Sequence, residues 1–213
     1  MFTGIIQHVG RVVSAGASGA GRRLGVETGP LAERLGPGAS LAVDGACLTV
    51  SAIDGQRVEL DVVPETLSRT TLGSVAVGAR VNLEPAIPAG GALDGHIVQG
   101  HVDGVVSVAR IDRGAGGHVL VLSGPTELTD QMVPKGSVAL AGVSLTLAEV
   151  ARGRFAVALV PTTLEATTLS AVRISDRLNV ELDIMGKYVR RWLEQSAGAG
   201  LTMDKLRREG FAG

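Results

Sequence analysis

The sequence predicts an all-β protein made of two tandem, homologous, six-stranded, Greek-key-like closed barrels followed by a C-terminal α-helix. Three observations favour this fold class: an internal repeat, short valine-rich runs separated by tight turns, and a change to helical periodicity near the end of the chain. The residues are 45% hydrophobic but only 2% aromatic, so the cores must be aliphatic, which favours pleated strands over helices.

The chain contains one pattern twice. Three pairs of segments match: GASLAVDGACLTV (38–50) with KGSVALAGVSLTL (135–147), PETLSRTTL (64–72) with PTTLEATTL (161–169), and RVNLE (80–84) with RLNVE (177–181). All three share an offset of 97 residues without a gap, which predicts two copies of one structural unit. Upstream, FTGIIQ aligns with VQGHVD at an offset of 96, so the apolar start is expected to be the first strand of repeat one.

Within the first repeat, the apolar runs are short and end at turn residues. Asp-Gly pairs at 44–45 and 54–55 supply the positive φ that two-residue hairpins need, so the runs beside them indicate a meander of strands. Strands are expected over 5–15, 23–28, 40–43, 46–53, 57–63 and 79–84, with helical turns near 30–35 and 65–72. Closing six short strands into a barrel removes the exposed edges of the sheet.

Four parts are predicted along the chain. Residues 85–95 are rich in Pro, Gly and Ala and form a linker, which assigns 1–94 to the first barrel and 95–184 to the second. An amphipathic helix is assigned to 185–197 because five apolar residues follow helical spacing: Met185, Tyr188, Val189, Trp192 and Leu193. This helix packs either on the barrels or on a second copy of itself, and 198–213 is expected to be a polar tail.

Composition and motifs argue against several functions. A formal net charge of -1 gives no basic stripe for nucleic acid. No apolar run reaches the length of a membrane helix and no signal peptide is recognisable, so a cytoplasmic location is expected. Cys47 is the only cysteine, and no cluster has the spacing of a metal site. Phosphate-binding loops and the hydrolase elbow are also missing from the sequence.

The repeat brings polar residues to equivalent positions. Cys47 and Thr49 correspond to Ser144 and Thr146, and each pair lies on one face of its strand, as two copies of a polar ligand site would require. On the pattern alone, the more common interpretation is an ordinary buried cysteine with strand-forming threonines. His101 is likewise more often a structural histidine than a catalytic one.

Beyond these patterns, six segments resemble the riboflavin synthases of the trimeric, two-barrel type: MFTGII, DGACLTV, ETLSRTTLG, GGALDGHIVQGHVD, PKGSVALAGVSLTL and PTTLEATTL. The resemblance implies two lumazine-binding repeats and a dismutation. Two molecules of 6,7-dimethyl-8-ribityllumazine exchange a four-carbon unit and give riboflavin and 5-amino-6-ribitylaminouracil. The resemblance implies no cofactor, because the C7 methyl group of the substrate supplies the carbanion. It also implies a homotrimer held by the C-terminal helices, and it leaves an association with lumazine synthase open.

The resemblance further implies which residues touch the two rings. One ring is expected against Gly4, Ile5, Ile6, Ser144, Leu145, Thr146, Ala158, Leu159, Val160, Pro161, Thr162 and Thr163. The other is expected against Cys47, Leu48, Thr49, Asp61, Val62, Val63, Pro64, Glu65, Thr66, Gly100, His101 and Val102. Lys135 would reach in from a neighbouring chain, and Phe2 and Thr3 would fold over a ring. Proton transfer or nucleophile activation is associated with the positions of Ser40, Cys47, His101, Ser144 and Asp183, and which of them is the base stays open.

One position departs from the family pattern. Asp-Gly is usual in the second barrel, where this chain has Ala141 and Gly142, whereas Asp44 and Gly45 remain in the first. Because alanine tolerates positive φ poorly, either the second turn changes type or a carboxylate near one site is missing. Two other interpretations stay open: a non-catalytic lumazine- or flavin-binding protein on the same barrels, and a structural barrel pair without a ligand.

Overall fold

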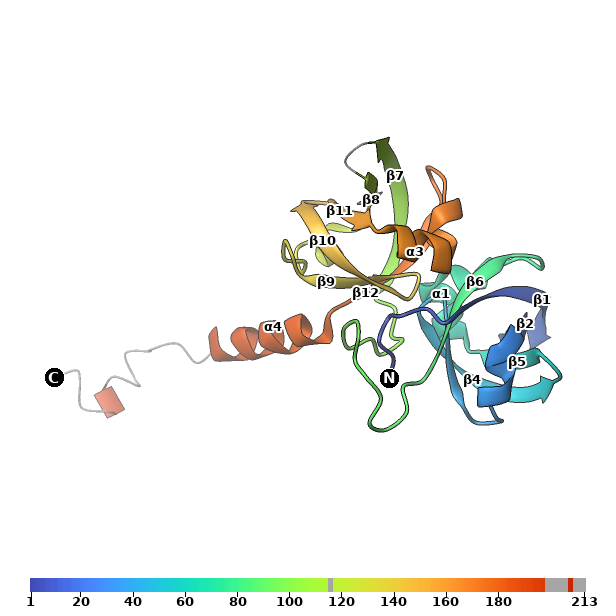
Figure 1. The fold of residues 1–213 in the computed structure, drawn as a ribbon. Helices are drawn as coiled ribbons and strands as arrows, with labels where there is room; N and C mark the ends of the chain where they lie inside the picture. Colours follow the sequence, from blue (N-terminus) through green and yellow to red (C-terminus); the bar gives the residue numbers. More distant parts are fainter. Residues whose placement is uncertain (115–116, 198–206, 209–213) are drawn as a thin grey trace.

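The computed structural model describes residues 1–114, 117–197 and 207–208, in which twelve strands form two closed antiparallel barrels (Figure 1). The first barrel contains β1 (His8–Ser18), β2 (Gly21–Glu27), β3 (Ser40–Val43), β4 (Ala46–Asp54), β5 (Arg57–Val62) and β6 (Arg80–Pro85). The second contains β7 (Gly104–Gly114), β8 (Gly117–Ser123), β9 (Ser137–Leu140), β10 (Val143–Ala151), β11 (Arg154–Leu159) and β12 (Arg177–Leu182).

The strand order confirms the predicted fold class. The first barrel closes in the order β1-β2-β5-β4-β3-β6, and the second repeats this order with β7 to β12. Pairing of β2 with β5 and of β3 with β6 joins strands that are not consecutive, which gives the Greek-key-like arrangement. Each barrel therefore has no free edge along which another strand could add.

Alternation along the strands separates an aliphatic core from an outward face. In β4, Leu48 and Val50 are buried in the first core, whereas Cys47 is half-buried and Thr49 is exposed. Strand β10 repeats this alternation around the second core. Burying each such aliphatic side chain stabilises the fold by about 1.5–3 kcal/mol. The polar residues that the repeat aligns are thus left facing outward.

Short helices follow β5 and β11 in both barrels. Proline opens α1 (Pro64–Arg69) and α3 (Pro161–Ala166), where its fixed φ suits the first helical turn. Threonine then caps the turns η2 (Thr71–Gly73) and η3 (Thr168–Ala171) by accepting the N–H of Leu72 or Leu169. The remaining short helices in the described residues are η1 (Gly29–Arg34) and α2 (Thr126–Thr129).

The start of the chain differs from the prediction. Strand β1 begins at His8 rather than at residue 5. The preceding residues are not strand because the N–H groups of Thr3 and Gly4 donate to the carboxylate of Glu84, and Gly4 has a φ of 78°. The chain therefore bends there instead of extending β1.

Phe2 lies between the two barrels. It makes an isolated antiparallel bridge with Val98 and is fully buried in a small cluster with Val98, Ala42 and Ala139. Its side chain has no exposed surface with which to cover a ring. Phe2 therefore contributes to inter-barrel packing in this chain.

Two buried asparagines join the barrels reciprocally. The Asn82 side chain donates to the carbonyl of Ala141 and accepts the N–H of Thr168. The Asn179 side chain donates to the carbonyl of Asp44 and accepts the N–H of Thr71. Because both amides are satisfied across the interface, they fix the two barrels in a pseudo-two-fold arrangement.

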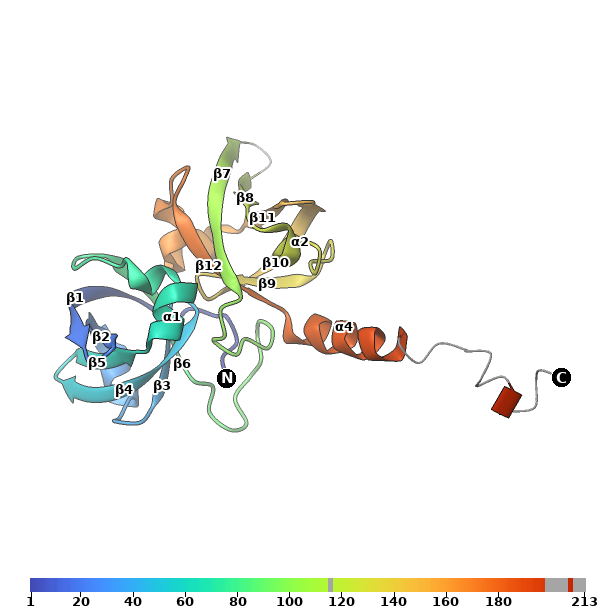
Figure 2. The same ribbon diagram turned by 180° about the vertical axis from the view of Figure 1, so that it is seen from behind.

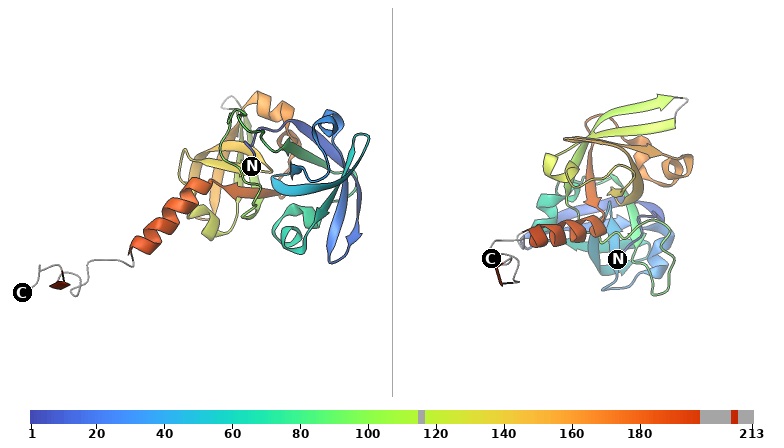
Figure 3. Two further views of the ribbon diagram at one scale, coloured as in Figure 1. Left: turned by 90° about the horizontal axis from the view of Figure 1, so that it is seen from below. Right: turned by 90° about the vertical axis from the view of Figure 1, so that its left-hand side faces the viewer.

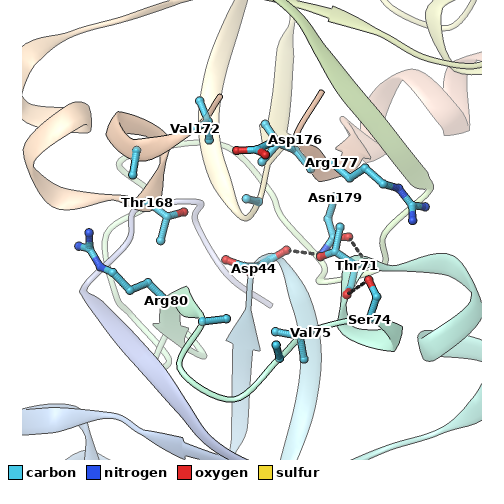
Figure 4. Close-up of a pocket in the computed structure, with 15 residues that line it drawn as sticks. Asp44, Thr71, Ser74, Val75, Arg80, Thr168, Val172, Asp176, Arg177 and Asn179 are labelled. Atoms are coloured by element: carbon cyan, nitrogen blue, oxygen red, sulfur yellow. Dashed lines mark hydrogen bonds between the residues drawn. The ribbon is translucent and has the colours of Figure 1, made fainter. Parts of the chain in front are cut away.

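The turn at Ala141 keeps its type. Ala141 has a φ of 46° and Asp44 a φ of 45°, so the change of turn type allowed for above is wrong and the carboxylate alone is missing. Asp44 accepts the backbone N–H of Asn82 at 2.8 Å. The equivalent Asn179 has an alanine methyl group in place of this acceptor. Both turns line a pocket of about 510 Å³ between the barrels, shown in Figure 4.

Ala141→Asn is expected to raise the free energy of unfolding by about 1 kcal/mol, because asparagine tolerates positive φ and offers an acceptor to Asn179. Chemical denaturation at one protein concentration measures the change. Ala141→Gly is the control, since it relieves the backbone without adding an acceptor. If Ala141→Asn is no more stable than Ala141→Gly, the missing acceptor is unimportant.

Asp44→Asn is expected to stabilise the protein by about 2 kcal/mol more at pH 8 than at pH 5. Burial raises the pKa of Asp44 from 3.8 to about 7, and the hydrogen bond from Asn82 only partly opposes this. The native state therefore binds more protons than the unfolded state between these pKa values, and its stability falls as pH rises through that window. Denaturation at both pH values tests this, and an equal effect at both would contradict it.

The C-terminal helix α4 (Ile184–Ala197) extends away from both barrels, as Figures 2 and 3 show. Lys187 in its first turns pairs with Asp103 at 2.6 Å. Its five predicted apolar residues are all more than half exposed, so the helix does not pack back on the barrels. No helix in the described residues is long and apolar enough to span a membrane. The predicted tail at 198–213 lies almost wholly outside the described residues.

Candidate functional site

A cavity of about 360 Å³ opens on the outward face of the first barrel. Its lining comes from β4, α1 and the segment that leads into β7: Ala46, Cys47, Glu65, Thr66, Arg69, Thr70, Gly100, His101 and Val102. The volume lies within the range of small-molecule pockets. Six residues expected at one ring therefore converge here: Cys47, Glu65, Thr66, Gly100, His101 and Val102.

The segment before β7 reaches this pocket from the second repeat. The carbonyl of Gly100 accepts the N–H of Cys47 at 2.9 Å. Gly100 has a φ of 81°, and a Cβ there would lie 2.4 Å from the Cβ of Cys47. Only glycine permits this approach, so the backbone of residue 100 forms one wall of the site.

The second barrel repeats the arrangement with the start of the chain. The carbonyl of Gly4 accepts the N–H of Ser144 at 2.8 Å. A Cβ on Gly4 would lie 2.6 Å from the Cβ of Ser144. Ile5 is exposed beside this contact, whereas Ile6 packs against the second core. The segments that lead into the barrels thus cross over, and each completes the site of the other barrel.

The second site contains a histidine that the sequence analysis did not single out. His96 Nδ1 lies 2.7 Å from Ser144 Oγ. Burial lowers the pKa of His96, and the negative charge of Asp183 partly offsets this. His96 Nε2 is buried and has no hydrogen-bond partner among the described residues. A neutral imidazole held by a hydroxyl, with one nitrogen unpaired, can accept or donate a proton.

The signal for His96 was weak because it lies upstream of the segment VQGHVD (98–103), where the alignment of the two repeats begins. The two sites are unequal: Ser144 faces His96 in the second, whereas Cys47 shares the first with His101. Asp183 lies just before α4, where its Oδ1 accepts the N–H of Met185.

Four of the expected ring contacts point into the cores instead of outward: Leu48, Val62, Leu145 and Leu159. These four can offer only backbone atoms to a ligand on the outer face. Eight others are exposed on that face or in the helix that follows: Thr49, Val63, Pro64, Thr146, Ala158, Val160, Pro161 and Thr162. Thr163 is half-buried in α3.

The remaining predicted residues lie around the sites. The carboxylate of Asp61 is held by Arg23 at 2.7 Å, and both side chains are about half exposed. The Asp61 pKa is lowered by this hydrogen bond. Ser40 faces Thr49 across the β3–β4 ladder. Lys135 is exposed in the turn before β9, so its side chain is accessible to a neighbouring chain.

The two sites lie apart within one chain, and this separation limits the reactions that a single chain can carry out. No residue between 143 and 163 lines the first-barrel cavity, so ligands in the two sites do not share one pocket within a chain. No group of three or more potential metal ligands occurs in the described residues. The first site offers a cavity for a small molecule, and the second offers a hydroxyl–imidazole pair, Ser144 and His96, that can move a proton.

Comparison with known proteins agrees with this geometry. The lumazine binding domain family matches the chain twice, over residues 3–86 and 99–183. Riboflavin synthase of Bacillus subtilis is 36% identical over 196 residues, which are 92% of this chain and 91% of that protein. Riboflavin synthase of Mycobacterium bovis is 40% identical over 203 residues, 93% of this chain and 100% of that protein.

Solved structures of LumP share the fold. The complex of LumP with riboflavin has a TM-score of 0.78 at 26% identity and covers 85% of this chain and 99% of that one. The complex with 6,7-dimethyl-8-(1'-D-ribityl) lumazine has a TM-score of 0.76 at 25% identity, with 85% and 98% covered.

Proposed function

This chain belongs to the riboflavin synthase family, and on that premise we propose that it dismutates 6,7-dimethyl-8-ribityllumazine. One molecule donates a four-carbon unit and leaves as 5-amino-6-ribitylaminouracil, and the other accepts the unit and becomes riboflavin. The observation that carries the proposal is the pair of like sites, each completed by a crossing segment. A reaction between two copies of one molecule requires two such sites.

We further propose that the two rings meet between chains. The first-barrel cavity has no lining from the second-barrel site, which supports a meeting of the rings between chains rather than within one. The exposed apolar face of α4 supplies an oligomerisation surface, in agreement with the expected homotrimer. In such a trimer the first barrel of one chain faces the second barrel of its neighbour. Holding two reactants face to face contributes up to roughly 7–11 kcal/mol in favourable cases.

His96 and Ser144 are the proposed proton-transfer groups in the second site. The C7 methyl group of one lumazine must lose a proton before carbon–carbon bond formation, and a neutral His96 can take up a proton at Nδ1 from the hydroxyl of Ser144 as that hydroxyl accepts the proton of the substrate. Ser144 holds the imidazole through Nδ1 and fixes its orientation. Cys47 and His101 line the other site, where they contact the second lumazine.

A non-catalytic lumazine- or flavin-binding protein is the second candidate, because the LumP structures hold such ligands on this fold. Loss of one site would favour it, but here both crossing segments, Ser144 and Asp183 are retained. A cytoplasmic location and an association with lumazine synthase stay predictions.

Incubation of the purified protein with 6,7-dimethyl-8-ribityllumazine and no additive distinguishes these candidates. The proposal predicts steady riboflavin formation, with two lumazines consumed for each riboflavin, followed by absorbance and fluorescence. Tight lumazine binding without riboflavin formation would support the non-catalytic candidate. Absence of any lumazine binding would support a structural barrel pair.

A further inference from the structure

Two buried glutamates hold the crossing segments in place. Glu84 at the end of β6 accepts the N–H of Thr3 at 2.6 Å, the hydroxyl of Thr3 at 2.7 Å and the N–H of Gly4 at 2.9 Å. It is 2% exposed. A carboxylate that accepts several N–H and O–H donors in a buried site makes strong, directional bonds.

Glu181 at the matching position of β12 does the same for the other segment. It accepts the N–H of Gln99 at 2.7 Å and that of Gly100 at 2.9 Å, and it is 3% exposed. Burial raises the pKa of both carboxyls, and the N–H donors oppose that effect. Both carboxylates are therefore anchored by backbone donors of segments about 80 residues away.

The opposite side of each segment contacts the other barrel. Gly4 is held through its N–H by Glu84 of the first barrel, and its carbonyl binds Ser144 of the second. Gly100 is held through its N–H by Glu181 of the second barrel, and its carbonyl binds Cys47 of the first. Each glutamate is thus placed to control a site that lies on the barrel to which it does not belong.

We propose that Glu84 and Glu181 are positioning residues that act crosswise: Glu84 sets the geometry of the second-barrel site, and Glu181 that of the first-barrel site. Neither side chain is among the residues that line the first-barrel cavity, so Glu181 acts through Gly100 and His101. The functional meaning of this inference rests on the proposed function, but the geometry can be tested without turnover.

Cys47 provides a reporter for the first-barrel site because it is the only cysteine in the chain. Glu181→Gln removes one carboxylate acceptor from Gln99 or Gly100 and loosens the segment against Cys47. We expect a chromogenic disulfide reagent to label Cys47 about tenfold faster in this variant than in the unmodified protein. We also expect that riboflavin no longer slows the labelling of Cys47 in this variant. Glu84→Gln is expected to leave both quantities within about twofold of the unmodified protein, because its bonds lie at the other site.

Lumazine titration completes the test. Glu84→Gln is expected to weaken lumazine binding at the second-barrel site about tenfold. Lumazine binding at the first-barrel site, which protects Cys47, is expected to be unchanged. Glu59→Gln is the matched control, since it makes the same charge change on β5, where the carboxylate pairs with Arg57. If the glutamine variants do not fold, Glu84→Asp and Glu181→Asp keep the charge, retract the carboxylate by one methylene and should show the same crossed pattern more weakly.

The crosswise assignment would be overturned if Glu84→Gln and Glu181→Gln changed the labelling rate of Cys47 equally, or if Glu181→Gln left that rate unchanged. If riboflavin and lumazine fail to protect Cys47 in the unmodified protein, the proposed function is at fault instead. The labelling rates of the ligand-free variants then still decide the positioning role.

Discussion

Replacing Trp192 and Leu193 together by aspartate is expected to give monomers with folded barrels and turnover reduced at least about a hundredfold. These side chains are 65% and 53% exposed on a helix that extends away from the barrels. Their burial against other chains is the main apolar gain available to α4, and two charges there would have to be desolvated. Because the rings are proposed to meet only between chains, the monomer should still bind ligand but not turn it over.

Light scattering, circular dichroism and riboflavin formation measure these three properties. A control exchanges the ion pair on the polar side of the same helix, as Arg190→Glu with Glu194→Arg, since the native pair is separated by 2.8 Å at the surface. That variant should remain oligomeric and active. An active monomer of the Trp192 and Leu193 variant would contradict a site shared between chains.

His96→Gln is expected to lower turnover by about a hundredfold, which is the lower range for loss of a general acid or base. We expect this loss because His96 Nδ1 contacts Ser144 Oγ, whereas His96 Nε2 has no hydrogen-bond partner among the described residues. Glutamine keeps a similar shape and polarity but cannot exchange a proton near neutral pH. Ligand protection of Cys47 should be unchanged, because that thiol reports the other barrel.

The matched control for His96 is His118→Gln. His118 in β8 also has a buried Nε2 with no partner among the described residues and a pKa lowered by burial, but it faces Leu159 across the ladder rather than Ser144. The two variants should have similar stability, and only His96→Gln should lose turnover. Equal losses in both would show that the effect is structural.

The sequence was sufficient for the barrels because their signals are local and repeated. Asp-Gly turns and period-two alternation predicted β3, β4 and β5 to within one residue. The same alternation placed Cys47 and Thr49 on one face, as the structure confirms. The family resemblance assigned consecutive strand residues to the ligand. It therefore included Leu48 and Val62, whose side chains point into the core, together with their outward-facing neighbours.

Other features could not be predicted because distant residues determine them. Residues 2–7 are apolar like a strand, but Glu84 takes the N–H groups of Thr3 and Gly4, which a continuous β-ladder would need. The crossing of the two segments also depends on contacts more than 80 residues apart. Ala141 keeps a positive φ because its carbonyl accepts a bond from the Asn82 side chain and its N–H donates to the carbonyl of Asn179, which overrides the local preference of alanine.

The most direct test of a shared active centre uses two variants that each block one site. Thr66 lines the first-barrel cavity, and Thr163 occupies the matching position of α3, so Thr66→Trp and Thr163→Trp should each abolish turnover. If the chain is a trimer as proposed, co-expression at equal amounts gives mixed trimers in which about a quarter of the interfaces join two unblocked sites. We expect recovery of about a quarter of the activity of the unmodified protein. Activity that stays at the level of the separate variants would show that the two lumazines do not meet between neighbouring chains.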